Sequence, residues 1–122
     1  MNGGAKTWYF PDGYLPEKSQ EGKMEAHEAL MLLNTGIETV NVKIDIYFEN
    51  HAPIRDISVS IDGERIKTLR LDKPCDIGGV ILPVLTQYSL RIRADKNIIA
   101  QFGRLDTTQN NMAYYGVMGC WE

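Results

Sequence analysis

A short polar segment follows an apolar run near residue 100 of this chain. Residues 98–100 are Ile-Ile-Ala, and they lead through Gln101 and Phe102 to Arg104 and Asp106. In a strand, side chains two residues apart point to the same face, so this arginine and this aspartate would lie side by side. Such a pair could hold the polar groups of a ligand, or it could be an ion pair that fixes the end of a sheet or a subunit contact. The spacing alone leaves both interpretations open.

Other polar and aromatic residues also occupy positions where a core pattern would favour apolar side chains. Aromatic rings stack on the C–H faces of sugar rings, and Arg, Asp, Asn and Gln provide donors and acceptors for hydroxyl and carboxylate groups. We expect such residues to line a site for a small, sugar-like ligand, with two aromatic side chains as a stacking wall. The candidate ligand-binding residues are Trp8, Asp12, Tyr14, His27, Glu28, Asn34, Arg70, Gln101, Arg104 and Asp106, the wall being Trp8 and Tyr14.

A metal site is not indicated. His27-Glu28 resembles the start of the zinc motif HExxH, but the second histidine of that motif is replaced by Met31. The other histidine, His51, lies in a turn segment far from any further ligand pair. We therefore expect no metal and no other cofactor.

Catalytic motifs are equally scarce. The chain contains no GxSxG, GxGxxG or GxxxxGK[ST] sequence. Asp12, Glu28 and Asp106 are carboxylates that could do acid–base work, although each could equally cap a turn or pair with an arginine. We expect a protein that is not an enzyme. The alternative is an enzyme acting on a sugar-like substrate with Glu28 or Asp106 as the acid–base group.

The clearest strand signal covers residues 40–50. Apolar and polar residues alternate there for nine positions, which predicts a strand with one buried face and one wet face. The outward positions include Lys43, Asp45, Tyr47 and Glu49. This face could be exposed to solvent or could form an oligomer contact.

Two hairpins are also predicted. Residues 56–62 alternate and end at Asp62-Gly63, a dipeptide typical of hairpin turns, so residues 64–71 should return antiparallel. Residues 89–94 alternate in the same way, and the polar residues 95–97 predict a turn before a returning strand. That returning strand covers 98–105, with Gly103 as a candidate bulge.

The remaining pattern predicts an all-β protein. A helix over 21–33 is an alternative for part of the chain, since apolar residues there also have helical spacing. The segment 11–26 reads as a long irregular loop. We expect a single-domain antiparallel β-sandwich over residues 1–122, with about seven to eight strands and little helix. Further strands are expected at Lys6–Phe10, Ala29–Asn34 and Ala113–Met118.

The composition limits the classes of binding partner and the cellular compartment that we expect. The chain has 122 residues and a net charge of -3, with basic and acidic residues interspersed, so a nucleic-acid partner is not expected, although a local basic face would fit that total. Cys75 and Cys120 show no disulfide or metal pattern, which indicates a reducing compartment. Because no signal peptide or membrane-spanning segment is visible, we expect a soluble, cytoplasmic protein.

Several motifs stand in order along nearly the whole chain, namely Trp8, Asp12–Pro16, His27-Glu28, Leu33-Asn34, Ile44–Phe48, Tyr88-Ser89, Ile98–Gln101, Arg104–Asp106 and Gln109. This ordered set resembles the Anabaena sensory rhodopsin transducer family. The resemblance implies a cytoplasmic β-sandwich, a homotetramer without catalytic activity, and a sensory role through a small ligand or a membrane receptor. Our first hypothesis is a protein that binds a small polar ligand or a signalling partner, and the two alternatives are the enzyme described above and a purely structural interaction module.

Overall fold

The computed structural model describes residues 3–17, 26–106, 113–117 and 119–122. These residues form eight antiparallel strands and a single 3-10 turn, which confirms the expected all-β fold. The elements are β1 (Ala5–Tyr14), β2 (His27–Asn34), β3 (Val40–Phe48), β4 (Ile54–Ile61), β5 (Arg65–Arg70), η1 (Pro74–Asp76), β6 (Gln87–Asp106), β7 (Ala113–Val117) and β8 (Cys120–Trp121).

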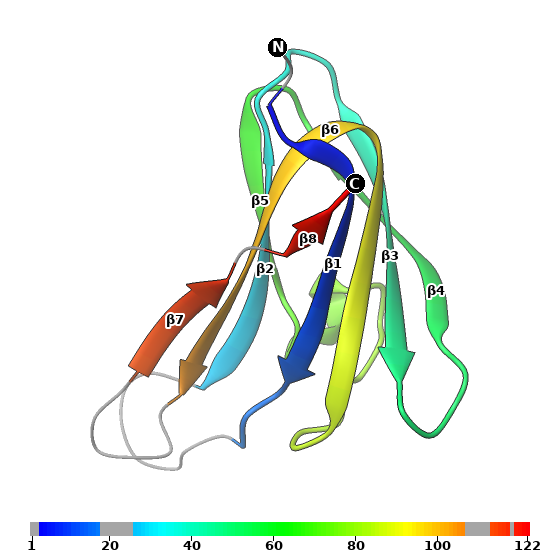
Figure 1. The fold of residues 1–122 in the computed structure, drawn as a ribbon, viewed down its shortest axis with the longest axis vertical. Helices are drawn as coiled ribbons and strands as arrows, with labels where there is room; N and C mark the ends of the chain where they lie inside the picture. The colour runs from blue at the N-terminus through cyan, green and yellow to red at the C-terminus, as the bar shows by residue number, and fades with distance from the viewer. Residues whose placement is uncertain (1–2, 18–25, 107–112, 118) are drawn as a thin grey trace.

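The strands form two layers that share one strand. The first sheet has the order β4-β3-β6-β1-β8, and the second has β5-β2-β6-β7. The 20-residue strand β6 contributes its first half to the first sheet and its second half to the second. In Figure 1, β6 arches over one end of the molecule as it passes between the layers.

The hairpin predicted at residues 95–97 is wrong, because β6 continues through them. Ala94 is paired with β3, whereas Ile99 is already paired with β2. In the pairing of β6 with β1, Arg93 lies opposite Thr7 and Ile98 lies opposite Ala5. Five residue steps of β6 therefore match two of β1, so β6 contains a bulge there. The polar residues that predicted a turn instead form the corner at which β6 changes sheets.

The hairpin predicted at Asp62-Gly63 is also wrong. β4 pairs with β3 in the first sheet, and β5 pairs with β2 in the second, so the chain crosses between layers here. A Cβ atom on Gly63 would lie 2.1 Å from the carbonyl oxygen of Ile37, and the next amide, that of Glu64, donates to the Gly36 oxygen at 2.8 Å. Glycine is therefore required by close packing against the β2–β3 loop and not by a hairpin.

The expected strand at 40–50 is confirmed as β3, whose residues Val40, Val42, Ile44 and Ile46 are buried. The core lies between the two sheets, where Phe10 of β1 and Phe102 of β6 have ring centroids 6.0 Å apart. Alternating apolar side chains thus fill the interior from both layers.

Residues 27–33 belong to β2, so the helix alternative is wrong for that part, and residues 21–25 lie outside the described residues. The three further strands are present, and β1 extends to Tyr14, into the segment expected to be a loop. Within the described ranges, no helix is long and apolar enough to cross a membrane.

Candidate functional site

Glu28, the second residue of β2, lies at the centre of a buried polar network. Its side chain is fully buried. Its two carboxylate oxygens accept hydrogen bonds from the Tyr14 amide at 3.0 and 3.2 Å, and Oε1 also accepts one from the Tyr88 hydroxyl at 2.7 Å. Oε2 accepts a hydrogen bond from Nε of Arg104 at 2.6 Å. Three segments far apart in the sequence are thereby joined through one carboxylate.

The sheet register explains why these side chains meet. Glu28 is directly opposite Arg104 in the β2–β6 pairing, while Tyr88 lies opposite Gly13 in the β1–β6 pairing. A Cβ atom on Gly13 would lie 2.4 Å from the Tyr88 ring, so only glycine lets the ring lie over β1. The ring can therefore reach inward, and its hydroxyl meets Glu28.

The network opens to solvent on the side of Asp12, whose side chain is 80% exposed. Nη2 of Arg104 lies 4.0 Å from Oδ1 of Asp12. The Gln87 side-chain amide donates to the same oxygen at 3.1 Å and to the Gly13 carbonyl at 3.0 Å. We call Asp12, Tyr14, Glu28, Gln87, Tyr88 and Arg104 the Glu28 network.

The surroundings of Tyr88 keep its phenol protonated. Burial raises the pKa of Tyr88, and the neighbouring Glu28 carboxylate raises it further. The phenol therefore stays protonated and donates to Glu28. Arg104, which is 15% exposed, supplies the positive charge that balances the buried carboxylate.

The network unites four of the residues that the sequence singled out, namely Asp12, Tyr14, Glu28 and Arg104. His27 adjoins it and is half-buried, with its backbone opposite Leu105. Asp106 pairs through its backbone with Ala113, and its side chain lies outside the described residues.

Three other predicted residues lie apart from the network. Trp8 is buried, and its indole N–H donates to the carbonyls of Ala5 at 3.1 Å and Ile98 at 3.2 Å, so its ring is part of the core and not an exposed stacking wall. Arg70 is held by Asp72 at 2.7 and 2.6 Å. Gln101 is exposed on β6.

Sequence reasoning about the site missed Gln87 and Tyr88. Both stand at the start of β6, where the alternation gives no sign of what lies opposite. The one available signal was Gly13 in β1, since a glycine inside a strand can mark the close approach of another group.

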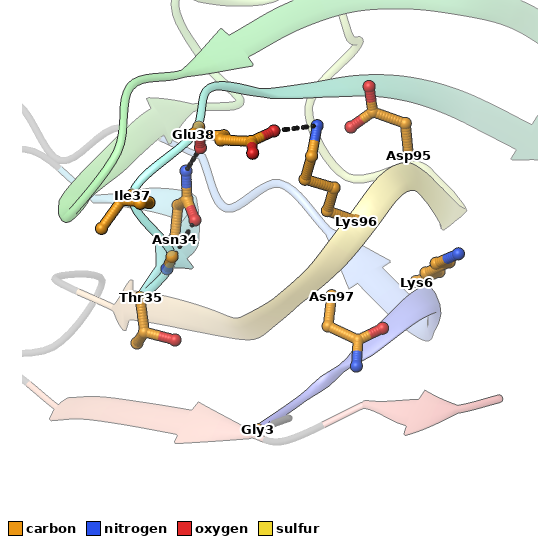
Figure 2. A pocket seen from close by; sticks show the side chains of 10 residues that line it. Gly3, Lys6, Asn34, Thr35, Ile37, Glu38, Asp95, Lys96 and Asn97 are labelled. Atoms are coloured by element: carbon orange, nitrogen blue, oxygen red, sulfur yellow. Dashed lines mark hydrogen bonds and ion pairs between the residues drawn. The ribbon is translucent and has the colours of Figure 1, made fainter. Parts of the chain in front are cut away.

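Asn34 lies at the other end of β2, where it organises the loop that follows. Its side-chain amide donates to the carbonyls of Glu38, Ile61 and Asp62 at 2.8, 3.1 and 3.2 Å, and its Oδ1 accepts from the Gly36 amide at 3.0 Å. A cavity of about 550 Å³ opens beside it, as Figure 2 shows. We call this the corner cavity, because residues 95–97 of the β6 corner form part of its wall.

Asp45 forms a second buried ionic cluster, on the outer face of the first sheet. The sequence predicted a solvent-exposed position for Asp45. Its side chain is instead fully buried beneath Arg91 and Arg93, which bind it at 2.8 and 2.9 Å. Burial raises the pKa of Asp45, but hydrogen bonds from Arg93, the Asp56 amide and Arg91 outweigh that effect and lower it to about 2. The feature of the sequence that could have indicated this cluster is the pair Arg91 and Arg93, which are two residues apart and so share one face of a strand.

Among the described residues, no group of three or more His, Cys, Asp or Glu side chains is placed to hold a metal ion. Cys75 and Cys120 are both exposed and are not joined in a disulfide.

Comparison with known proteins identifies the family to which this fold belongs. Residues 3–121 match the family described as Anabaena sensory rhodopsin transducer. Among solved structures, Thermotoga maritima 1070 matches with a TM-score of 0.86 and 33% identity, covering 99% of this chain and 97% of that chain. The Anabaena sensory rhodopsin transducer matches with a TM-score of 0.74 and 26% identity, covering 90% and 96%. No curated protein matched. The chain belongs to the Anabaena sensory rhodopsin transducer family.

Proposed function

We propose that this protein is a non-enzymatic sensory transducer that binds a small polar, sugar-like ligand at the exposed side of the Glu28 network. Family membership supports the transducer role. The observation that carries the ligand proposal is the position of Arg104, which is anchored to a buried carboxylate on one side and faces an exposed one on the other.

The contact between Arg104 and Asp12 is well suited to exchange with a ligand. At 4.0 Å, and with Asp12 80% exposed, this ion pair contributes little to stability. A ligand hydroxyl or carboxylate could replace Asp12 while Glu28 keeps the guanidinium in position. Tyr14, whose backbone amide donates to Glu28, is 39% exposed and offers an aromatic ring for stacking.

Burial argues against the alternative of an enzyme that uses Glu28. A general acid or base must come within hydrogen-bonding distance of its substrate. Glu28 is fully buried, and both of its oxygens already accept hydrogen bonds from protein groups. This arrangement suits a residue that positions Arg104 better than one that exchanges protons with a substrate.

The proposed transducer is a cytoplasmic homotetramer in which residues 1–122 form one domain, and it passes the binding event to a membrane receptor or another signalling partner. These parts of the proposal rest on the family resemblance. A purely structural interaction module, in which the same polar groups form a subunit contact, is the competing hypothesis.

Thermal-shift screening of the full chain against sugars, uronates and other small metabolites tests the proposal. A ligand of the network should raise the melting temperature, and Asp12→Ala and Gln87→Ala should alter the shift without unfolding the protein, since Asp12 is exposed and Gln87 lies at the rim. The exposed residue Asp62 supplies the matched control, Asp62→Ala.

Light scattering on the same variants separates the hypotheses. An unchanged tetramer mass together with an altered ligand shift supports the binding role. Loss of the tetramer in Asp12→Ala would favour the interaction module, and chemical conversion of a bound compound would contradict the non-enzymatic assignment.

A further inference from the structure

The corner cavity combines a rigid frame with loosely held charged groups. Asn34 is buried and makes four hydrogen bonds on one wall, two within the β2–β3 loop, to Glu38 and Gly36, and two to the carbonyls of Ile61 and Asp62 at the end of β4. On the other wall, Asp95 accepts hydrogen bonds from the backbone and side-chain amides of Asn41 at 3.0 and 3.2 Å. A ligand entering here would meet walls that are already ordered, which lowers the entropic cost of binding.

Lys96 and Glu38 form an ion pair in the lining of this cavity, and the Lys96 ammonium also donates to the Thr39 carbonyl at 3.4 Å. Their charged groups are 3.6 Å apart, and their side chains are 45% and 73% exposed. Figure 2 shows the two side chains pointing toward one another, with Asn97 and Thr35 below them. Because an exposed pair at this distance is worth little, a ligand can separate it at low cost.

The balance of charge in the cavity points to the type of ligand. Its ionisable lining residues are Lys6, Lys96, Glu38 and Asp95, which is two of each sign. A ligand with one charge would meet repulsion from the like-charged groups. A molecule that carries both an ammonium and a carboxylate would pair with Glu38 and Lys96 together.

We propose that the corner cavity binds a small zwitterion of the amino-acid type. Its ammonium group pairs with Glu38 and its carboxylate with Lys96, while the amide of Asn97 and the hydroxyl of Thr35 are the neutral hydrogen-bonding groups nearby. The volume of about 550 Å³ is within the range of small-molecule sites.

This site is separate from the Glu28 network and does not depend on the function proposed for it. Glu28 and Asn34 stand near opposite ends of β2, and six residues of strand span about 20 Å. Signals from the two regions can therefore be distinguished in one experiment.

Titration of the ¹⁵N-labelled full chain with glycine and L-glutamine, followed by NMR, tests the proposal. Both probes should give saturable shifts of the amides of residues 35–38 and 95–97. Glycolate and ethylamine, which carry only one of the two charges, should bind about ten-fold more weakly. Lys96→Gln and Glu38→Gln should each weaken glycine binding by about ten-fold, whereas the exposed control Lys67→Gln should leave it unchanged.

Both test substitutions are at exposed side chains, and the dispersion of the spectra shows directly whether each variant is folded. The proposal is overturned if neither amino acid gives a saturable shift, if glycolate binds as well as glycine, or if the two variants bind like the unmodified protein. Shifts confined to Tyr14 and Tyr88 would assign the binding to the Glu28 network instead and would also overturn it.

Discussion

Glu28 and Asp45 are two fully buried carboxylates, one in each sheet, and each is held by arginine. A buried charge is tolerated when it is paired and hydrogen-bonded, and loss of one partner leaves the other partner uncompensated. The contribution of Glu28 and of Asp45 to stability therefore depends on the groups that pair with each carboxylate. The two cases differ in surroundings, since Glu28 also has the Tyr88 hydroxyl and Asp45 has two arginines.

Removing the charge of Glu28 should destabilise the protein strongly. We expect Glu28→Gln to lower the free energy of unfolding by about 3 kcal/mol, because Arg104, which is largely buried, loses the buried carboxylate that accepts its hydrogen bond at 2.6 Å. Tyr88→Phe should cost about 1.5 kcal/mol, because it removes one hydrogen bond to a charged group. Urea denaturation measures both values, with the exposed Glu49→Gln as a control expected within about 0.5 kcal/mol of the unmodified protein. Equal stability of Glu28→Gln and the control would refute this role.

Asp45 should make stability depend on pH in the acid range. Its pKa is lowered from 3.8 to about 2 in the folded protein, so its contribution is complete above the unfolded value and is lost as the pH falls through the folded value. We expect about 2 kcal/mol of stability to disappear between about pH 4 and pH 2 from this residue. Urea unfolding at several pH values should show a shallower acid loss in Asp45→Asn. An identical pH profile in both proteins would show that the contribution comes from elsewhere.

At the scale of elements, turn-like sequences in this fold serve as crossings between sheets. The corner of β6 at residues 95–97 and the link at Asp62-Gly63 are both rich in turn-forming residues, and each joins a strand segment of one sheet to a segment of the other. Local turn propensity indicates that the chain changes direction. It does not indicate which strand the following segment pairs with.

The segment before β6 contains a local strain that can be relieved. Leu85 has a φ of 54°, is 49% exposed, and donates its amide hydrogen to the Leu15 carbonyl at 2.8 Å. Glycine adopts this conformation without steric cost, so Leu85→Gly should stabilise the protein by about 0.5 kcal/mol. The neighbouring Val84→Gly, at a residue without positive φ, should destabilise it by a similar amount. Thermal unfolding of the two variants gives the comparison, and a loss of stability in Leu85→Gly would show that the strain is not significant.

At the scale of the whole molecule, β6 is the strand that the two sheets share. It pairs with β1 and β3 in one layer and with β2 and β7 in the other, and the buried apolar residues form one cluster. We expect unfolding of either layer to disturb the strand that the other layer also uses. Stability should therefore be shared across both layers.

We expect a single unfolding transition as a consequence. Tryptophan fluorescence, which reports on Trp8 in the first sheet and on Trp121 packed 5.4 Å from it, should change together with the far-ultraviolet circular dichroism of the whole chain. Urea titrations at one protein concentration compare the two signals. Transitions with different midpoints would show that the layers unfold separately.

The amino-acid sequence by itself determined the all-β content and the apolar inward face of β3. Period-two alternation identifies β3 and the first half of β6 because a strand with one buried face must alternate. The sequence also singled out Glu28, Arg104, Asp12 and Tyr14, since each is a polar or aromatic residue at an expected strand end or next to a glycine.

Only the tertiary structure decided which strands pair and what each polar residue contacts. Pairing is set by packing between segments far apart in the chain, such as Glu28 opposite Arg104, and no local pattern encodes that distance. For the same reason Trp8 became part of the core, Asp45 was buried under two arginines on the outer face, and Tyr88 entered the network through the space left by Gly13.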